Sequence, residues 1–156
     1  GQDLGIRHFG SRALDSLRLE KSFGNWAREF RSIYGPFEAD MGRFVDLSKN
    51  DFVGRAAALA EKEEGPKRMR VTLVIDHDDI DVIGDEPVWH DDKVVGWVTS
   101  GAYAHYVDKS VALAYIPTEL SQDANGTFEV EVLGERRPAV LAPEPLFDPK
   151  AERMRM

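Results

Sequence analysis

The sequence of 156 residues contains no cysteine, which excludes disulfide bonds, thiolate metal ligands and a cysteine nucleophile. It also has no apolar run near the roughly 20 residues that a membrane-spanning helix requires, and its start lacks the order of a signal peptide. We therefore expect no membrane partner and a cytoplasmic location, or the mitochondrial matrix if the organism is eukaryotic. Hydrophobic residues make up 42% of the chain, enough to fill a core.

Basic residues are scarce in the second half of the chain. Residues 71–156 hold 7 Lys and Arg against 17 Asp and Glu, whereas residues 1–70 hold 13 against 11. Because such a surface repels phosphates, we expect no nucleic-acid partner. Eight acidic residues lie between Asp76 and Asp92, but Ile80 and Ile83 fall where an EF-hand loop needs an oxygen ligand. We therefore expect solvated acidic loops and predict no metal site.

Apolar residues recur at helical spacing in the first third of the chain. The pattern predicts a helix over residues 8–20 and about two further helical turns over residues 26–34. A strand is predicted over residues 41–47. The next helix should carry Phe52, Ala56, Leu59 and Ala60 on one face and end at Gly65-Pro66.

The remaining sequence alternates with a period of two and is interrupted by turn signals. Six short strands are predicted, over residues 68–76, 88–90, 94–99, 110–116, 127–133 and 139–141. Tight turns are expected at 90–93, Asn125-Gly126 and Gly134-Glu135. The fold class is therefore predicted as α+β, with a helix-rich N-terminal segment followed by a small antiparallel β-barrel or sandwich. We place the boundary at residues 64–67.

Four motifs in register carry a family resemblance. They are LRLEK at 17–21, PFEA at 36–39, KNDFVGR at 49–55 and VGWVTSG at 95–101. In order and spacing they resemble the aminomethyltransferase family, which includes the glycine-cleavage T-protein and the folate-linked dimethylglycine and sarcosine dehydrogenases. Glu20-Lys21 and the tail sequence FDP at 147–149 are similar to the dehydrogenase branch.

The resemblance implies a function in folate-dependent one-carbon transfer. Residues 1–65 would be the end of the folate-binding transferase domain, and residues 66–156 the C-terminal β-barrel domain. The family's catalytic aspartate and its FAD-binding region would both precede this chain, so we assign no catalytic residue here. Tetrahydrofolate is the implied cofactor, and the missing N-terminal portion of the same protein is the implied partner. A non-catalytic structural module of a flavoprotein complex is the alternative.

Four residues are candidates for folate binding on this resemblance. Glu20 matches the family glutamate that holds the pterin ring, and a carboxylate can accept two parallel N–H donors. Trp26 stands near the family's aromatic position, where its face could stack on the pterin, although packing in the core or an interface is an equal alternative. Lys49 replaces an Arg that contacts folate, keeping the charge without the planar fork. Arg70 could face the glutamate tail of folate or lie on the outer sheet face.

Ser100 lies in a Thr-Ser-Gly sequence that we interpret as a corner between two strands. Its surroundings differ from the Gly-x-Ser-x-Gly nucleophile elbow, which connects a strand to a helix. We therefore expect Thr99 and Ser100 to bond the turn backbone rather than to perform chemistry.

Overall fold

The computed structural model describes residues 1–76, 80–123, 126–153 and 155. Its centre is a closed antiparallel barrel with strand order β1-β4-β3-β2-β5-β6. The strands are β1 (Arg68–Ile75), β2 (Pro87–His90), β3 (Lys93–Ala104), β4 (Lys109–Pro117), β5 (Phe128–Val132) and β6 (Glu135–Ala142). Each of the six predicted strands is present, although β3 and β6 are longer than predicted. Of the two predicted architectures, the structure has the barrel.

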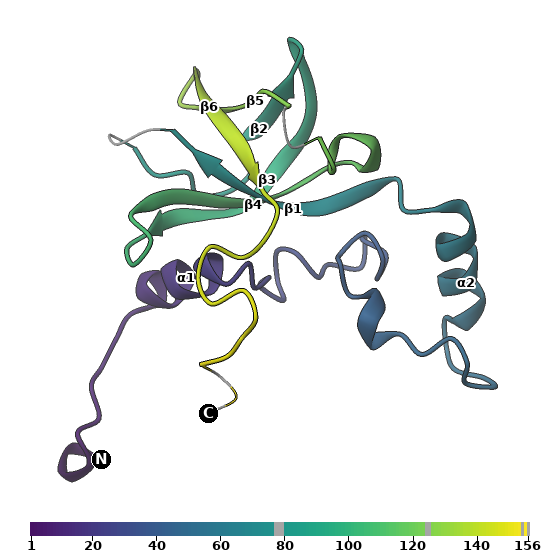
Figure 1. Cartoon of the computed structure of the whole chain (residues 1–156), viewed down its shortest axis with the longest axis horizontal. Helices are drawn as coiled ribbons and strands as arrows, with labels where there is room; N and C mark the ends of the chain where they lie inside the picture. The colour runs from purple at the N-terminus through teal and green to yellow at the C-terminus, as the bar shows by residue number, and fades with distance from the viewer. Residues whose placement is uncertain (77–79, 124–125, 154, 156) are drawn as a thin grey trace.

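The first part of the chain is less helical than predicted. It holds α1 (Ser11–Glu20) and α2 (Arg55–Glu64), with the 3-10 turns η1 (Gln2–Leu4) and η2 (Gly42–Phe44) between stretches of turn. A further 3-10 turn, η3 (Thr118–Leu120), follows the barrel strand β4. Figure 1 shows α1 lying beneath the barrel, while α2 and the N-terminal segment extend away on opposite sides.

Three local predictions in the first part are wrong. Residues 26–34 form turns instead of a helix, and the predicted strand at 41–47 contains η2. A closed barrel offers no free edge to which a seventh strand could pair. The helix predicted from Phe52 begins at Arg55, because Gly54 before it has φ of 88°. Ala58, rather than Ala56 or Ala60, is the buried residue of α2.

The predicted corner at residues 99–101 is also wrong, because β3 continues through it. A register shift between Val98 and Ser100 marks an irregularity in the pairing of β3 with β4. Gly101 is needed there, since a Cβ atom would lie 2.5 Å from the carbonyl oxygen of Val82. Thr99 Oγ1 does bond backbone, donating to the carbonyl of Leu113 at 3.1 Å.

Tight turns close two of the barrel hairpins, the first where it was predicted and the second one residue earlier than the predicted Gly134-Glu135. Asp91 and Asp92 connect β2 to β3 with φ of 47° and 59°, and Leu133 and Gly134 connect β5 to β6 with φ of 50° and 84°. Two successive positive φ values are typical of type I′ turns, which match the twist of paired strands. The Asn125-Gly126 prediction and part of the acidic segment 76–92 lie outside the described residues.

The barrel encloses the main core. Buried apolar side chains from all six strands form it, including Leu73, Val88, Val98, Phe128 and Ala139. A second, smaller cluster forms where α1 packs on the barrel, with Leu19, Val111 and Leu113 fully buried. This second cluster positions the end of α1, where the predicted Glu20 lies.

Candidate functional site

The end of α1 is a well-defined turn that orients Glu20. The amide of Phe23 donates to the carbonyl of Arg18 at 2.8 Å, and the amide of Ser22 donates to the carbonyl of Leu19 at 2.9 Å. These bonds form a Schellman motif, with Ser22 at φ of 55° where glycine is usual. The motif ends the helix directly after the predicted folate ligand.

Glu20 is a buried carboxylate, with only 2% of its surface exposed. Its Oε1 accepts the backbone N–H of Tyr106 at 2.7 Å. The Tyr106 amide is the donor that the structure gives this carboxylate among the described residues. Because a buried carboxylate without donors is costly, the Tyr106 amide stabilises it, while capacity for another donor remains.

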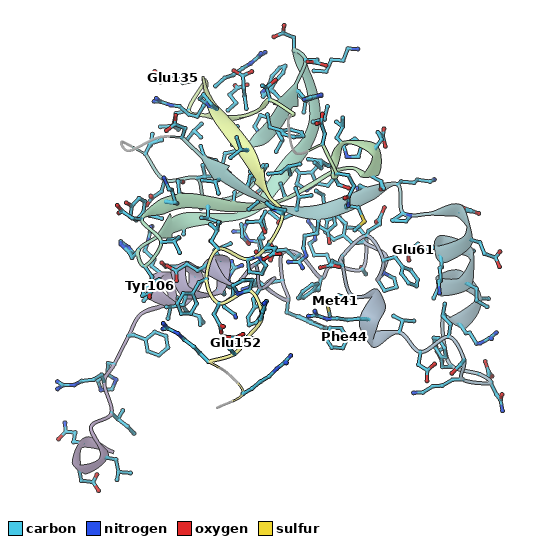
Figure 2. All side chains as sticks on the ribbon, viewed as in Figure 1. Met41, Phe44, Glu61, Tyr106, Glu135 and Glu152 are labelled. Carbon is cyan, nitrogen blue, oxygen red and sulfur yellow. The ribbon has the colours of Figure 1, made fainter. Side chains whose placement is uncertain are left out.

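A groove of about 1120 Å³ opens beside the end of α1. Its walls come from residues 21–24, from Phe30, from the segment around Met41 and Phe44, from β1 and from the segment after β6. Figure 2 shows Met41 and Phe44 on the turns that run below the barrel. The groove therefore combines aromatic side chains with the cations Arg43, Arg70 and Lys150.

Arg70 lines this groove, and its side chain is 10% exposed. Its Nε donates to the carbonyl of Ala39 at 3.1 Å and its Nη1 to the carbonyl of Ser22 at 2.8 Å. Nη2 lies 3.6 Å from a carboxylate oxygen of Asp40. Burial lowers the pKa of Arg70 and nearby Asp40 raises it, with burial prevailing, yet an arginine remains protonated. Arg70 thus supplies charge, while much of its donor fork is bonded to protein.

Trp26 and Lys49 lie apart from the groove. Trp26 is 82% exposed and makes an edge contact with Phe30, with ring centroids 6.4 Å apart. Lys49 is exposed, and its carbonyl accepts a bond from Arg55 Nε at 2.9 Å. Among the described residues, the groove lining includes only Arg70 of the four candidates. The chain by itself therefore does not bring the four together.

A second carboxylate, which sequence reasoning missed, lies deeper than Glu20. Glu29 is fully buried and accepts the Ser100 hydroxyl at 2.6 Å and the Asn25 amide at 2.5 Å. Arg18 Nη1 lies 3.7 Å from its Oε2. Ser100 also borders a smaller hollow of about 440 Å³, together with Arg12 and Arg28.

No periodic signal could have found Glu29. It lies in an irregular segment between Arg28 and Phe30, and Ser100 follows it 71 positions later. The one available hint is the polar pair Thr99-Ser100 inside an otherwise apolar strand. Buried polar groups need partners, so such a pair predicts an unidentified polar contact from elsewhere in the chain.

Stacked aromatic side chains connect the segment around Glu29 to the barrel. The rings of Tyr34 and Tyr115 stack with centroids 3.8 Å apart, and the Tyr115 hydroxyl donates to the carbonyl of Glu29 at 2.8 Å. The indole N–H of Trp97 donates to the Tyr34 hydroxyl at 3.1 Å. Burial raises the pKa of Tyr115 well above its ordinary value, so the phenol stays a donor.

Two negative observations complete the description. Within the part of the chain that the structure describes, no group of three or more His, Asp or Glu side chains could hold a metal ion. No described helix is long and apolar enough to cross a membrane. The candidate site is the groove with its cations, and Glu20 is the last residue of α1, directly before the lining residue Lys21.

Fold and groove together define a class: a small closed antiparallel barrel with a helix packed below it and a ligand-sized groove at their junction. The family model "Glycine cleavage T-protein C-terminal barrel domain" matches residues 68–148, and the model "GCVT N-terminal domain" matches residues 1–49. The chain belongs to the glycine cleavage T-protein family.

Similar proteins agree with this assignment. Dimethylglycine dehydrogenase of Homo sapiens, a mitochondrial protein, is 43% identical over the whole chain, and an aminomethyltransferase of Prochlorococcus marinus is 35% identical over 92% of it. The chain spans only 18% and 38% of the length of these relatives. A crystal structure of aminomethyltransferase T from Bartonella henselae shares the fold, with a TM-score of 0.86 at 24% identity over 94% of this chain and 41% of that one.

Proposed function

We propose that this chain is the C-terminal, folate-site-forming part of a tetrahydrofolate-dependent dimethylglycine or sarcosine dehydrogenase, or of an aminomethyltransferase. In either protein a one-carbon unit would pass from an N-methyl or aminomethyl amine to tetrahydrofolate. The observation that supports this most is the groove at the end of α1, whose lining starts at Lys21, the residue after Glu20.

The residues of the groove suit the chemistry of a folate. A folate has a flat pterin, an aromatic benzoyl ring and an anionic glutamate tail. Phe23 and Phe30 offer aromatic faces, while Arg43 and Arg70 offer positive charge. Residues present in this chain therefore fit both ends of such a ligand.

Glu20 would hold the pterin ring. Its Oε2 can accept one N–H donor, and Oε1 can accept a second beside the Tyr106 amide because a carboxylate oxygen has two lone pairs. Two parallel bonds would fix the orientation of the ring, and positioning is a large part of catalysis in a transfer reaction. Trp26 and Lys49 would reach the ligand only together with residues from outside this chain.

The exposed apolar side chains support a partner for the first part of the chain. Ten large hydrophobic residues within positions 1–60 are exposed, among them Phe9, Leu14, Leu17 and Trp26. Apolar side chains exposed in this number favour an interface with another part of the protein. We propose that the remainder of the same protein, including its catalytic and FAD-binding regions, covers them.

The same exposed surface also favours the alternative, a non-catalytic module that packs against a flavoprotein. The two functions differ in whether the groove binds a ligand. Tetrahydrofolate binding that depends on Glu20 would distinguish the folate site from the purely structural module.

Isothermal titration of tetrahydrofolate tests the proposal, using the protein as its gene encodes it. Glu20→Gln should weaken binding about tenfold or more, because the amide offers one acceptor oxygen where the carboxylate offers two. Glu63→Gln, an exposed change on α2, is the control and should bind like the wild type. Equal affinity of the Glu20→Gln variant and the wild type would refute the role of Glu20.

A further inference from the structure

The C-terminal segment Leu146–Asp148, here called the tail latch, returns to the end of α1 (Figure 1). The amide of Phe147 donates to the carbonyl of Glu20 at 2.9 Å. This carbonyl belongs to the last turn of the helix, whose carbonyls have no partner within the helix itself. The tail latch thus caps the very residue that carries the buried carboxylate.

An ion pair connects the tail latch to Lys21, the residue that follows Glu20. Lys21 Nζ donates to the backbone carbonyl of Asp148 at 2.5 Å and to its Oδ2 at 3.2 Å. The two side chains are only 11% and 9% exposed, so solvent screens the pair weakly. Burial raises the pKa of the Asp148 carboxyl, but the bonds from Lys21 and from the Glu152 amide outweigh this and lower it.

The tail latch also touches the residue that binds the Glu20 carboxylate. The rings of Phe147 and Tyr106 meet edge to face, with centroids 4.7 Å apart and planes at 75°. Figure 2 shows Tyr106 beside α1. Leu146 packs against the cluster that contains Leu19. The tail latch therefore contacts both the backbone carbonyl of Glu20 and Tyr106, the residue whose amide binds the Glu20 carboxylate.

We propose that the tail latch positions the Glu20 carboxylate, with Asp148 as the positioning residue. The expected effect on folate binding rests on the proposed function. The positioning of the Glu20 carboxylate by the tail latch does not depend on that function. Asp148 does not touch the groove, so it would act on the ligand through Lys21 and Glu20. Loss of its charge would loosen the tail latch and free the Tyr106 amide from Oε1.

Hydrogen exchange measured by mass spectrometry provides the first test, on the protein as its gene encodes it and without folate. In Asp148→Asn, a peptide covering residues 104–109 should exchange about tenfold faster than in the wild type. The Asn Oδ1 can still accept the Glu152 amide, and the Asp148 carbonyl can still accept Lys21 Nζ, so the change removes mainly the charge that pairs with Lys21. Glu152→Gln is the matched control, because it removes one negative charge from an exposed residue four positions after Asp148. Unchanged exchange in Asp148→Asn would overturn the proposal.

Titration with tetrahydrofolate provides the second test. Asp148→Asn should weaken binding about tenfold, and Asp148→Glu should restore much of it. In a Glu20→Gln background the further loss should vanish, because the tail latch acts through Glu20. An equal loss in both backgrounds would overturn the positioning role. If Glu20→Gln alone leaves affinity unchanged, the proposed function fails, and the exchange experiment still decides the tail latch.

Discussion

Replacing the buried carboxylate of Glu29 should strongly destabilise the fold. Its side chain is fully buried and accepts the hydroxyl of Ser100 and the amide of Asn25, with Arg18 nearby. Glu29→Ala leaves these donors without an acceptor and opens a cavity in the same place. Hydrogen bonds to a charged group contribute about 1.5–3 kcal/mol each, and breaking a buried pair costs about 3–5 kcal/mol.

We therefore expect Glu29→Ala to lower the free energy of unfolding by about 3–5 kcal/mol, a large share of the roughly 5–15 kcal/mol that holds a domain folded. Glu29→Gln should cost less, since one amide oxygen can still accept the Ser100 hydroxyl. Ser100→Ala should cost about 1–2 kcal/mol, because Glu29 keeps its Asn25 and Arg18 contacts.

Urea denaturation followed by tryptophan fluorescence and circular dichroism measures these differences. The slope of the free energy of unfolding against urea concentration should be the same for all variants. An equal slope indicates that they unfold from a similar native state. Glu63→Ala on the exposed side of α2 is the control and should stay within about 0.5 kcal/mol of the wild type. A loss below about 1 kcal/mol for Glu29→Ala would refute the view that this carboxylate joins the first part of the chain to the barrel.

Two further predictions concern the barrel wall. Gly96→Ala would place a Cβ atom 2.0 Å from the backbone oxygen of Tyr115, so we expect a loss of about 2 kcal/mol or more in urea denaturation. The control Gly10→Ala has open space at its Cβ and should change the free energy of unfolding by less than about 1 kcal/mol. Similar losses for both variants would contradict the close contact expected at position 96. Because burial raises the pKa of Tyr115, the unfolded chain ionises this phenol first, and its contribution to stability falls as pH rises above about 10. The stability difference between wild type and Tyr115→Phe should therefore shrink between pH 8 and 11 in denaturant titrations, and a constant difference would show that Tyr115 has no part in alkaline destabilisation.

The predictable part of this protein is local. Each barrel strand alternates along its own sequence, and the turn at Asp91-Asp92 needs only two residues that tolerate positive φ. α1 was predicted to within a few residues because its pattern and its end lie in one short stretch. The predicted strand at 41–47 failed because β pairing depends on a free edge elsewhere, which the closed barrel does not provide.

The predicted site residues came from the family resemblance, and their role stays a prediction. The family resemblance pointed to Glu20 and Arg70. The structure places Arg70 in the groove lining, while Glu20 is bonded to the amides of Tyr106 and Phe147 and is not among the lining residues. The division into domains at 1–65 and 66–156 stays a prediction, as does the folate-binding role of all four candidates. Glu29 had no sequence signal, because its partner Ser100 comes from a distant strand.

The sequence alone determined the family, the six strands and the helix that carries Glu20, because motifs and periodicity are properties of neighbouring residues. Tertiary structure alone decided which polar groups are buried together. Glu29 meets Ser100, and Glu20 meets Tyr106 and Phe147, across separations of 71 to 127 positions. Such contacts form only when the barrel closes and the tail returns to α1, since burial forces each polar group to find a partner wherever the fold places one.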